Sequence, residues 1–357
     1  MIKFPSIEQF RNVVRNVQNR VRYDGKDEEG NPKFTNRPLP TLKFRGTVKL
    51  HGTNAAIVLN PDDTFTYQSR ERELSLTSDN AGFMLAMEGK KDVVRQLFGD
   101  LAEALDSIDG VEYNAREPQT TIAVYGEWAG GNIQKGVAIN GLEKFFAIFA
   151  VRVIDGEGNS QWADIKKLQH CCFPKEGIFH IMQFGSWEID INFERPEESQ
   201  NALSELTLKV EEACPAGKHF GQDGVGEGIV WTCVTPGWED SEFWMKVKGE
   251  KHSASKVKTL AKVDTEAIRA VNDFVDSAVT ENRLVQGAQY VVRELGKPFD
   301  MTSMGDFIRW VYGDVIKEET DTIVANQLDP KKLGGPISNK ARVWFQAKFN
   351  EGADFSA

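Results

Sequence analysis

Cysteine is scarce in this sequence, and its pattern excludes two common classes of site. The chain has four cysteines; Cys171 and Cys172 are adjacent, and no two are spaced as a CxxC pair. Neither a zinc-binding motif nor a redox-active dithiol is therefore present in the sequence. A few scattered thiols fit a reducing compartment better than a disulfide-stabilised secreted protein.

Long apolar runs and a leader-like N-terminus are also missing. No stretch approaches the roughly 20 apolar residues that cross a bilayer, and Met1 to Phe10 has no charged start followed by an apolar core. No internal repeat is visible. These absences predict an intracellular, cytoplasmic protein with no membrane partner.

Positive charge is in the minority. Lys plus Arg total 43 against 53 Asp plus Glu, so the formal net charge is −10. This balance argues against a protein that coats DNA without specificity. It does not exclude a nucleic-acid enzyme whose basic residues line one groove, because the local field steers the ligand.

What the chain does have is the composition of an ordinary globular protein. Its 357 residues, 40% hydrophobic and 27% charged, are long enough for two or three domains of roughly 150 residues. The spacing of apolar residues predicts a short helix from Phe10, an exposed loop over 20–40 and a helix over 81–105. Alternation and turn signals predict strands over 42–50, 54–59, 64–69, 121–128, 145–154, 228–234 and 243–248.

The character of the sequence changes after about Val263, where apolar residues recur only at helical spacing. The predicted fold class is therefore α+β. A mainly antiparallel domain over 1–260 precedes a small all-helical domain over 263–357.

Six short segments carry chemically useful residues in a fixed order. The first, KLHGTN at 49–54, places Lys49 at a strand end before a glycine turn, where its amine can reach a pocket. A solvated lysine beside a turn would give the same local sequence, so this motif alone is weak. The others are YQSR at 67–70, VYGEW at 124–128, FFAIFAV at 145–151, EGIVW at 227–231 and WMKVK at 244–248.

This ordered set resembles the covalent nucleotidyltransferases, the superfamily of ATP-dependent ligases and mRNA capping enzymes. More narrowly, it resembles the RNA ligase 2 family of phages and kinetoplastid RNA-editing ligases. His51 stands where DNA ligases and capping enzymes usually carry Asp in their KxDG motif, and GEWAG at 126–130 with IQK at 133–135 looks like the family's GEFAG…IQK segment. The helical tail also differs from the OB-fold barrel of those other enzymes. The resemblance covers about residues 40 to 320.

The resemblance implies an adenylation domain and an ATP-dependent RNA ligase, with Mg²⁺, or Mn²⁺ in its place, as the metal. A lysine would attack the α-phosphate of ATP, the AMP would pass to a 5′-phosphate RNA end, and a 3′-hydroxyl would then expel AMP. The implied partner is RNA with such ends, in a duplex or at a nick. Relatives imply a monomer, and phage relatives imply action in a host cytoplasm.

The resemblance makes Lys49 the nucleophile. The attack needs an uncharged amine, whereas a free lysine is almost fully protonated at neutral pH. Lys246 and Lys248 alternate on one strand face, so both can point into the same site. Their charges would favour the neutral amine and would stabilise the charge that develops on the phosphates. A solvated strand face is the simpler reading of these two lysines.

Two carboxylates complete the implied catalytic set. Glu127 would accept hydrogen bonds from the ribose, and Glu227 would orient Lys49. Both are candidate metal ligands, because magnesium prefers carboxylate oxygens and keeps most of its waters. An ion pair at a strand end would explain either glutamate alone.

The resemblance implies that the remaining motif residues would hold the nucleotide. Leu50, His51 and Asn54 come from the lysine motif, although His51 could equally pack to hold the turn. Arg70 would contact AMP or the RNA 5′-phosphate through a forked hydrogen bond, with Arg72 as its rival. Phe149 would stack on adenine.

Phe146, three residues earlier, is an equal candidate for stacking on adenine, and either ring could simply be core. The chain also departs from the family pattern at two positions. Thr232 replaces a lysine that often follows the EGIVW-type motif, and Ala150 replaces an aspartate. The first change removes a phosphate-seeking cation.

A cluster of lysines follows the last motif. Residues 246–262 hold six lysines and one acid, a local charge of 6 − 1 = +5 in an acidic protein. This pattern predicts an RNA-backbone track, with a solvated linker as the simpler reading. The alternatives for the whole chain are a DNA ligase, a GTP-dependent capping-type enzyme, or an inactive RNA-binding relative.

Overall fold

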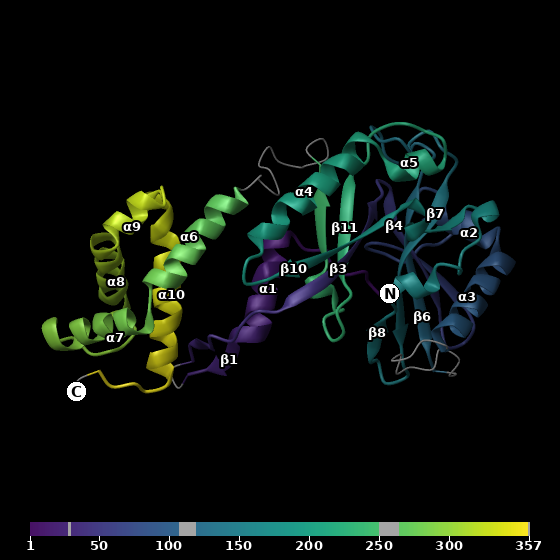
Figure 1. Cartoon of the computed structure of the whole chain (residues 1–357). Helices are drawn as coiled ribbons and strands as arrows, with labels where there is room; N and C mark the ends of the chain where they lie inside the picture. Colours follow the sequence, from purple (N-terminus) through teal and green to yellow (C-terminus); the bar gives the residue numbers. More distant parts are fainter. Residues whose placement is uncertain (28–29, 107–118, 250–263, 356–357) are drawn as a thin grey trace. The chain divides into compact units, whose positions relative to one another are not determined.

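The structure is a computed structural model that describes residues 1–27, 30–106, 119–249 and 264–355. Two compact units divide the chain: Met1–Asn16 with Thr41–Ala261, and Val17–Pro40 with Lys262–Ala357 (Figure 1). Residues 17–40 fall in the second unit, where the short strand β2 (Pro32–Phe34) packs against the C-terminal helix. The predicted boundary between folded domains at 260–263 lies outside the described residues and stays a prediction.

The first unit is built on two antiparallel sheets. The smaller sheet follows the order β10–β3–β11–β12. Strand β3, from the start of the unit, therefore lies between β10 and β11, which come later in the chain. Every pair in this sheet is antiparallel. Its strands are β3 (Thr41–Lys49), β10 (Ser186–Asn192), β11 (Gly228–Cys233) and β12 (Met245–Lys248).

The larger sheet has the order β5–β4–β6–β7–β8, and β9 adds to β7 as its single parallel pair. The strands predicted over 54–59 and 64–69 pair as β4 with β5, and those predicted over 121–128 and 145–154 pair as β6 with β7. The strands are β4 (Thr53–Leu59), β5 (Phe65–Ser69), β6 (Thr121–Ala129), β7 (Phe145–Ile154), β8 (Ser160–Trp162) and β9 (Ile178–His180). The antiparallel α+β class predicted from the sequence is thereby confirmed.

Helices cover the outer faces of both sheets. α2 (Phe83–Glu88) and α3 (Lys91–Asp106) pack on the larger sheet and enclose the main apolar core, which contains Phe83, Leu97 and Phe146. α4 (Glu197–Glu212) packs on β10 and β11 of the smaller sheet, followed by the short α5 (Pro215–His219). The face of the larger sheet opposite α2 and α3 is not covered by these two helices.

Two local predictions need correction. The helix predicted over 81–105 is two helices, because α2 ends at Gly89 and a new helix starts at Lys91. The loop predicted over 20–40 contains a small hairpin of β1 (Tyr23–Lys26) and β2 (Pro32–Phe34). Its strands are too short for sequence alternation to reveal them. This hairpin directly follows α1 (Phe10–Arg22), which is the helix predicted from Phe10.

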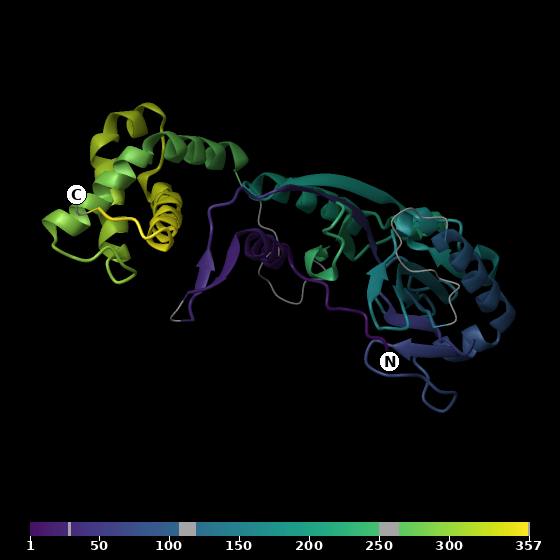
Figure 2. The same cartoon turned by 90° about the horizontal axis from the view of Figure 1, so that it is seen from below.

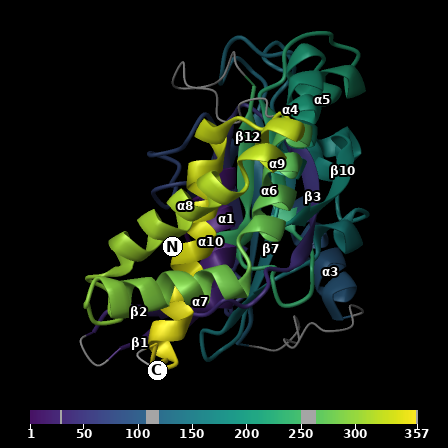
Figure 3. The same ribbon diagram turned by 60° about the vertical axis from the view of Figure 1, so that its left-hand side comes forward.

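The part of the second unit over residues 264–355 is built from helices, as the sequence predicts. Its longest helix, α10 (Pro330–Asn350), packs against α8 and α6 around a core that includes Phe307 and Phe345 (Figure 3). The other helices are α6 (Thr265–Ala278), α7 (Glu281–Gln289), α8 (Met304–Glu318) and α9 (Thr320–Ala325). Among the described helices, none has both the length and the apolar character needed to cross a membrane.

Gly126 lets β6 and β7 lie close together beside the main core. A Cβ at this position would meet the Phe146 ring at 2.4 Å and the Ala147 carbonyl oxygen at 2.7 Å. We expect Gly126→Ala to lower the free energy of unfolding by about 1–3 kcal/mol or more, because neither a buried ring nor a backbone oxygen can move away cheaply.

Chemical denaturation of Gly126→Ala and a matched control checks this expectation. Gly99, in α3, has no described atom within 4 Å of such a Cβ. We expect Gly99→Ala to be neutral or to stabilise by about 0.5–1 kcal/mol, because alanine favours the helix. Equal midpoints for the two variants would contradict the close packing described at Gly126.

Candidate active site

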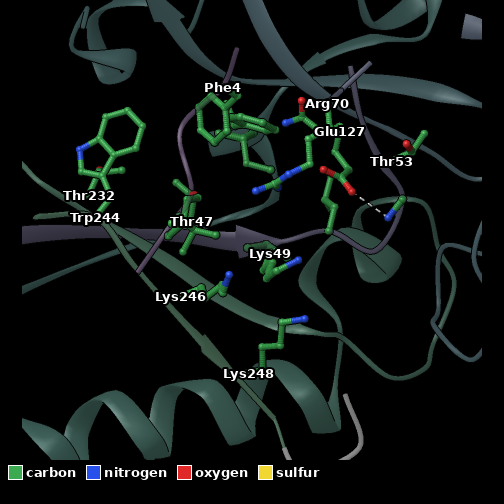
Figure 4. Close-up of a pocket in the computed structure, with 18 residues that line it drawn as sticks. Phe4, Thr47, Lys49, Thr53, Arg70, Glu127, Thr232, Trp244, Lys246 and Lys248 are labelled. Atoms are coloured by element: carbon green, nitrogen blue, oxygen red, sulfur yellow. Dashed lines mark hydrogen bonds between the residues drawn. The ribbon is translucent and has the colours of Figure 1, made fainter. Parts of the chain in front are cut away.

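A cavity of about 370 Å³ lies in the first unit between its two sheets. Strands β3, β11 and β12 supply lysines and threonines from one side, and β4, β6 and β7 supply residues from the other. Figure 4 shows the lining side chains, with Lys49, Lys246 and Lys248 near one another and Arg70 and Glu127 on the facing side. A cavity of this size fits a small-molecule ligand.

The register of the smaller sheet brings two of the lysines together. Gly228 of β11 pairs with Lys49 of β3 on one side and with Lys248 of β12 on the other. Since glycine has no side chain, position 228 places no side chain of its own between the two lysines. Gly228 also has φ of 151°, and a Cβ there would lie 2.2 Å from the Val247 carbonyl oxygen. Glycine is thus required by both the backbone and the site.

Glu227 is the centre of this cluster and is only 2% exposed. One carboxylate oxygen, Oε2, lies 2.8 Å from Lys49 Nζ and 3.2 Å from His51 Nδ1, and Oε1 lies 2.8 Å from Lys248 Nζ. Burial would raise the pKa of Glu227, but the charges and hydrogen bonds of Lys49 and Lys248 outweigh it and lower the pKa. This carboxylate is therefore ionised and fixes the direction of the Lys49 side chain.

Lys246 lies on the same face of β12, opposite Val230 of β11. Partial burial, and then the positive charges of Lys248 and Lys49, lower the pKa of Lys246, which the carboxylate of Glu8 partly offsets. A lysine crowded by other cations is a site for an anion. Lys246 and Lys248 are thus placed together on the cavity wall, as predicted from their alternation.

Glu127 approaches from the end of β6 and accepts a hydrogen bond of 2.9 Å from the backbone N–H of Gly52. Burial raises the pKa of Glu127 to about 7. The charge of Lys49 and the hydrogen bond from Gly52 lower this pKa in part, whereas the negative charge of Glu227 raises it further. The two glutamates therefore differ in protonation near neutral pH. Glu227 carries the fixed negative charge, and Glu127 titrates.

The raised pKa of Glu127 predicts a pH dependence of stability in the protein without nucleotide or metal. Between about pH 5 and 7 the folded protein holds a proton on Glu127 that the unfolded chain has lost, so stability falls as pH rises to about 7 and levels off above it. We expect a loss on the order of 2–3 kcal/mol across this range. Glu227 does not contribute there, because its lowered pKa matters only at more acidic pH.

Urea unfolding at several pH values, compared between wild type and Glu127→Gln, measures this contribution. The glutamine variant cannot titrate at this position, so its stability should vary less between pH 5 and 8 than that of wild type. Parallel stability profiles for the two proteins would show that Glu127 is not protonated at neutral pH.

The cavity also has an apolar part. Phe149 of β7 and Val230 of β11 both line it from opposite sheets, with Ile181 and Trp244 nearby. Phe146, the rival for stacking on a base, is fully buried in the core beneath α2. Of the two rings that the sequence left open, only Phe149 can meet a ligand in this cavity.

Arg70 and Arg72 have different positions. Arg70 follows β5 and lines the cavity. Arg72 donates hydrogen bonds of 2.8 Å to Ser78 Oγ and 2.9 Å to the Asp79 carbonyl oxygen, so it orders the loop before α2. Arg70 is the arginine available to a phosphate here.

The rest of the lysine motif also reaches the site. Leu50 and Asn54 line the cavity, and Asn54 is paired with Glu127 across the β4–β6 ladder. His51 lies against Glu227. Gln134, in the IQK segment, donates a hydrogen bond of 3.4 Å to the Gly52 carbonyl oxygen and so supports the glycine turn.

The site does not contain a preformed metal cage. Within the described residues, no group of three or more His, Cys, Asp or Glu side chains could hold a metal ion. Both oxygens of Glu227 contact cationic or imidazole nitrogens, so Glu227 would have to exchange a lysine for a metal. The Glu127 carboxylate is less occupied. These donors fit a Mg²⁺ ion that shares phosphate oxygens with a bound nucleotide.

Sequence reasoning missed several lining residues. Thr47 stands two residues before Lys49 on the same strand face, so alternation could have indicated it; Thr53 follows the glycine turn. Thr232 lines the cavity where the family pattern has a lysine. Phe4 and Ile7 carry no sequence signal for this site because they lie far along the chain from every motif that lines it.

The predicted lysine track includes Lys251, Lys256, Lys258 and Lys262, which lie outside the described residues.

The assembled groups have a consistent chemical character. One end of the cavity holds cations around a buried carboxylate and suits phosphates. The other end is apolar and aromatic and suits a flat base. A lysine amine stands at the cationic end beside Glu227. The arrangement can bind a nucleoside polyphosphate and present an amine to one of its phosphorus atoms.

Comparison with known proteins agrees with this chemistry. A family model described as RNA ligase matches residues 42–248, which include each of the six segments singled out in the sequence. A search of curated proteins finds no match.

Solved structures similar to this chain are RNA ligase structures from Naegleria gruberi. A mutant with ATP and Mn has 16% identity and a TM-score of 0.40, covering 70% of this chain and 57% of that chain. A second mutant, with AMP and Mn, has 17% identity and a TM-score of 0.41, and the ligase with PPi has 17% and 0.40, with the same coverage. This chain thus spans 57% of the length of those proteins.

Proposed function

This chain belongs to the RNA ligase family, and on that premise we propose that it is an ATP-dependent RNA ligase that uses a covalent AMP on Lys49. It would join a 3′-hydroxyl and a 5′-phosphate, at a nick in duplex RNA. One observation carries the proposal. Lys49, Lys246 and Lys248 converge with Glu127 and Glu227 in a cavity that also has an aromatic wall.

The first step transfers AMP to the protein. The Lys49 amine attacks the α-phosphorus of ATP, a P–N bond forms, and the P–O bond to the β-phosphate breaks. Pyrophosphate leaves with the electron pair of that bond. The amine must shed protons to react. Glu227 Oε2, 2.8 Å from Lys49 Nζ, is the nearest base, and water can take the proton directly because the Lys49 side chain is 21% exposed.

The other residues bind and stabilise. Lys246 and Lys248 offset the negative charge of the phosphates as pyrophosphate departs. Arg70, which is half-exposed at the cavity rim, would hold a phosphate of AMP or of the RNA end. Glu127 would accept ribose hydroxyl donors, and Phe149 and Val230 would hold the base between the sheets.

A Mg²⁺ or Mn²⁺ ion that enters with the triphosphate would neutralise phosphate charge. Glu127 is the carboxylate best placed to share it, and Glu227 is the alternative predicted from the sequence. The lysines in place supply the same kind of stabilisation from the protein side.

Two further steps complete the proposed reaction. The 5′-phosphate oxygen of one RNA strand attacks the lysyl-AMP phosphorus and frees the Lys49 amine. The 3′-hydroxyl of the other strand then attacks that 5′-phosphate, a phosphodiester forms, and AMP leaves. The proposed working form is a monomer in the cytoplasm, with basic residues near the site guiding the RNA backbone.

The test is the intact mass of the protein after incubation with Mg²⁺ and each nucleoside triphosphate in turn. The proposal expects a gain of one AMP with ATP alone, reversed by pyrophosphate, and sealing of a nicked RNA duplex in preference to nicked DNA. A GMP adduct would instead favour the capping-type transferase, and sealing of DNA alone would favour a DNA ligase. No adduct on protein free of AMP would leave the inactive RNA-binding relative.

A further inference from the structure

The N-terminal segment, residues 1–9, lies beside the cavity, although it is more than 30 residues from the nearest motif in the chain. It runs from the start of α1 to the N-terminus without regular secondary structure (Figure 2). Phe4 and Ile7 from this segment line the cavity. The match to the RNA ligase family begins at residue 42, so that match says nothing about this wall.

The segment is anchored at both ends. Near its start, the Ile2 N–H donates to Gln68 Oε1 at 3.1 Å, and the Tyr125 hydroxyl donates to the Ile2 carbonyl oxygen at 3.1 Å. Both anchors belong to the larger sheet. Because its backbone is held by side chains from two strands of that sheet, β5 and β6, this part of the segment has a defined position.

At the other end, Glu8 forms a parallel bridge with the edge strand β12 of the smaller sheet. Its N–H donates to the Trp244 carbonyl oxygen at 3.1 Å, and the Lys246 N–H donates to its carbonyl oxygen at 2.9 Å. The segment therefore connects the two sheets that enclose the cavity. It also pairs with the strand that carries Lys246 and Lys248.

Phe4 is the part of the segment that faces the apolar end of the cavity. It is 8% exposed, and its ring centroid lies 5.1 Å from that of Phe149, with the planes close to perpendicular. Tyr125, at 5.1 Å, and Trp244, at 6.0 Å, complete an aromatic cluster around it. Phe4 therefore both packs in this cluster and lines the cavity next to the ring proposed for the base.

We propose that Phe4 is a base-binding residue: the N-terminal segment presents its ring so that, together with Phe149, it forms the wall against which the adenine of ATP packs. This inference rests on the proposed function. Aromatic contacts with a base favour binding without hydrogen-bond readout. Phe4 therefore contributes to the affinity for the nucleotide and not to the attack on phosphorus.

The experiment measures the rate of AMP adduct formation against ATP concentration for wild type, Phe4→Ala and Phe4→Leu. We expect the KM for ATP to rise about tenfold in Phe4→Ala, with kcat changed much less. Phe4→Leu, which keeps an apolar side chain without a ring, should show a smaller rise. A purely structural role would instead lower the active fraction and the melting temperature and leave KM unchanged.

Two controls keep the result specific. Lys3→Ala removes only an exposed ion pair with Glu71 and should behave as wild type. In the reverse reaction, the KM for pyrophosphate should not change in Phe4→Ala, since pyrophosphate has no base. A variant that lacks residues 2–5 but keeps Glu8 should repeat the rise in KM, and it serves where a substitution at Phe4 prevents folding.

The outcomes separate the two proposals. If wild type forms no AMP adduct, the proposed function fails before Phe4 is tested. If wild type forms the adduct and all the Phe4 variants keep the wild-type KM for ATP, the base-binding role of Phe4 is overturned while the ligase proposal stands. An equal rise in the KM for ATP and for pyrophosphate would also overturn it, because the effect would not involve the base.

Discussion

Lys49→Ala is expected to reduce formation of the AMP adduct by on the order of a thousandfold or more, to background. Lys49 Nζ and Lys248 Nζ both lie 2.8 Å from the buried carboxylate of Glu227, and Lys49 is the one that begins the KLHGTN motif, from which the family resemblance assigns the nucleophile. Lys49→Arg should be equally inactive, because the guanidinium keeps the charge but stays protonated and cannot attack phosphorus. Intact mass after incubation with ATP and Mg²⁺ measures the adduct directly.

A matched control uses a second lysine on the same strand. Lys43 lies in β3, on the same alternation as Lys49, and its side chain is 52% exposed and does not line the cavity. Lys43→Ala should form the adduct at the wild-type rate. A stable AMP adduct on Lys49→Ala would place the nucleophile elsewhere, with Lys246 as the next candidate.

The same variant separates the first step from the last. The final step needs no free lysine amine, since the AMP is already on the RNA end. Lys49→Ala should therefore seal an RNA strand supplied with AMP on its 5′-phosphate, while failing to seal the ordinary 5′-phosphate strand. Loss of both activities in a folded variant would show that Lys49 acts beyond the covalent step.

Glu227→Gln is the change with the second-largest expected effect. Its two carboxylate oxygens contact Lys49, His51 and Lys248, whereas an amide offers one oxygen and one N–H₂ donor. One lysine would then face a donor and lose its partner. We expect adduct formation to fall by about a hundredfold or more, because the Lys49 amine is no longer directed and has lost its nearest base.

The same substitution should also reduce stability. Breaking a fully buried ion pair costs about 3–5 kcal/mol. Lys49 and Lys248 are partly exposed and can turn toward water, so we expect about 1–3 kcal/mol. Urea unfolding measures the change. Glu205→Gln, which breaks an exposed pair with Lys209, is the control and should be neutral in both stability and activity.

An unchanged rate in Glu227→Gln would contradict the positioning role of Glu227. A loss of stability with a normal rate would mean that the carboxylate serves only to pair buried charge. The melting temperature and the rate should be measured on the same preparation, so that a reduced folded fraction is not mistaken for slower chemistry.

Some features of the site depend on residue type and order alone. Lys49 and Glu227 are separated by 178 residues, but each sits in a short motif beside a predicted strand, and the order of the motifs indicates the family. The two lysines of β12 could be assigned to one face because strand side chains alternate. The antiparallel character and the helical tail likewise follow from periodicity.

Other features of the site depend on tertiary contacts that the sequence pattern does not show. Phe146 and Phe149 both lie in β7, which is buried on both faces, so apolar alternation cannot say which face meets the cavity. The packing of α2 and α3 on one face decides it, because they bury Phe146 and leave Phe149 on the other side. Arg72 was a rival to Arg70 in the sequence, and the tertiary structure separates them because Arg72 is bonded to the loop before α2 whereas Arg70 lines the cavity.

The sequence by itself determined the family, the order of the motifs, and the lysines and carboxylates proposed to carry the chemistry, because these depend on residue types at fixed local spacing. Only the tertiary structure decided how the lysines share one carboxylate, which ring faces the ligand, and that Phe4 joins the site. Those features depend on contacts between residues far apart in the chain, such as Phe4 with Phe149 and Glu8 with Trp244. Local periodicity describes each strand alone, whereas the cavity exists only after the two sheets have packed.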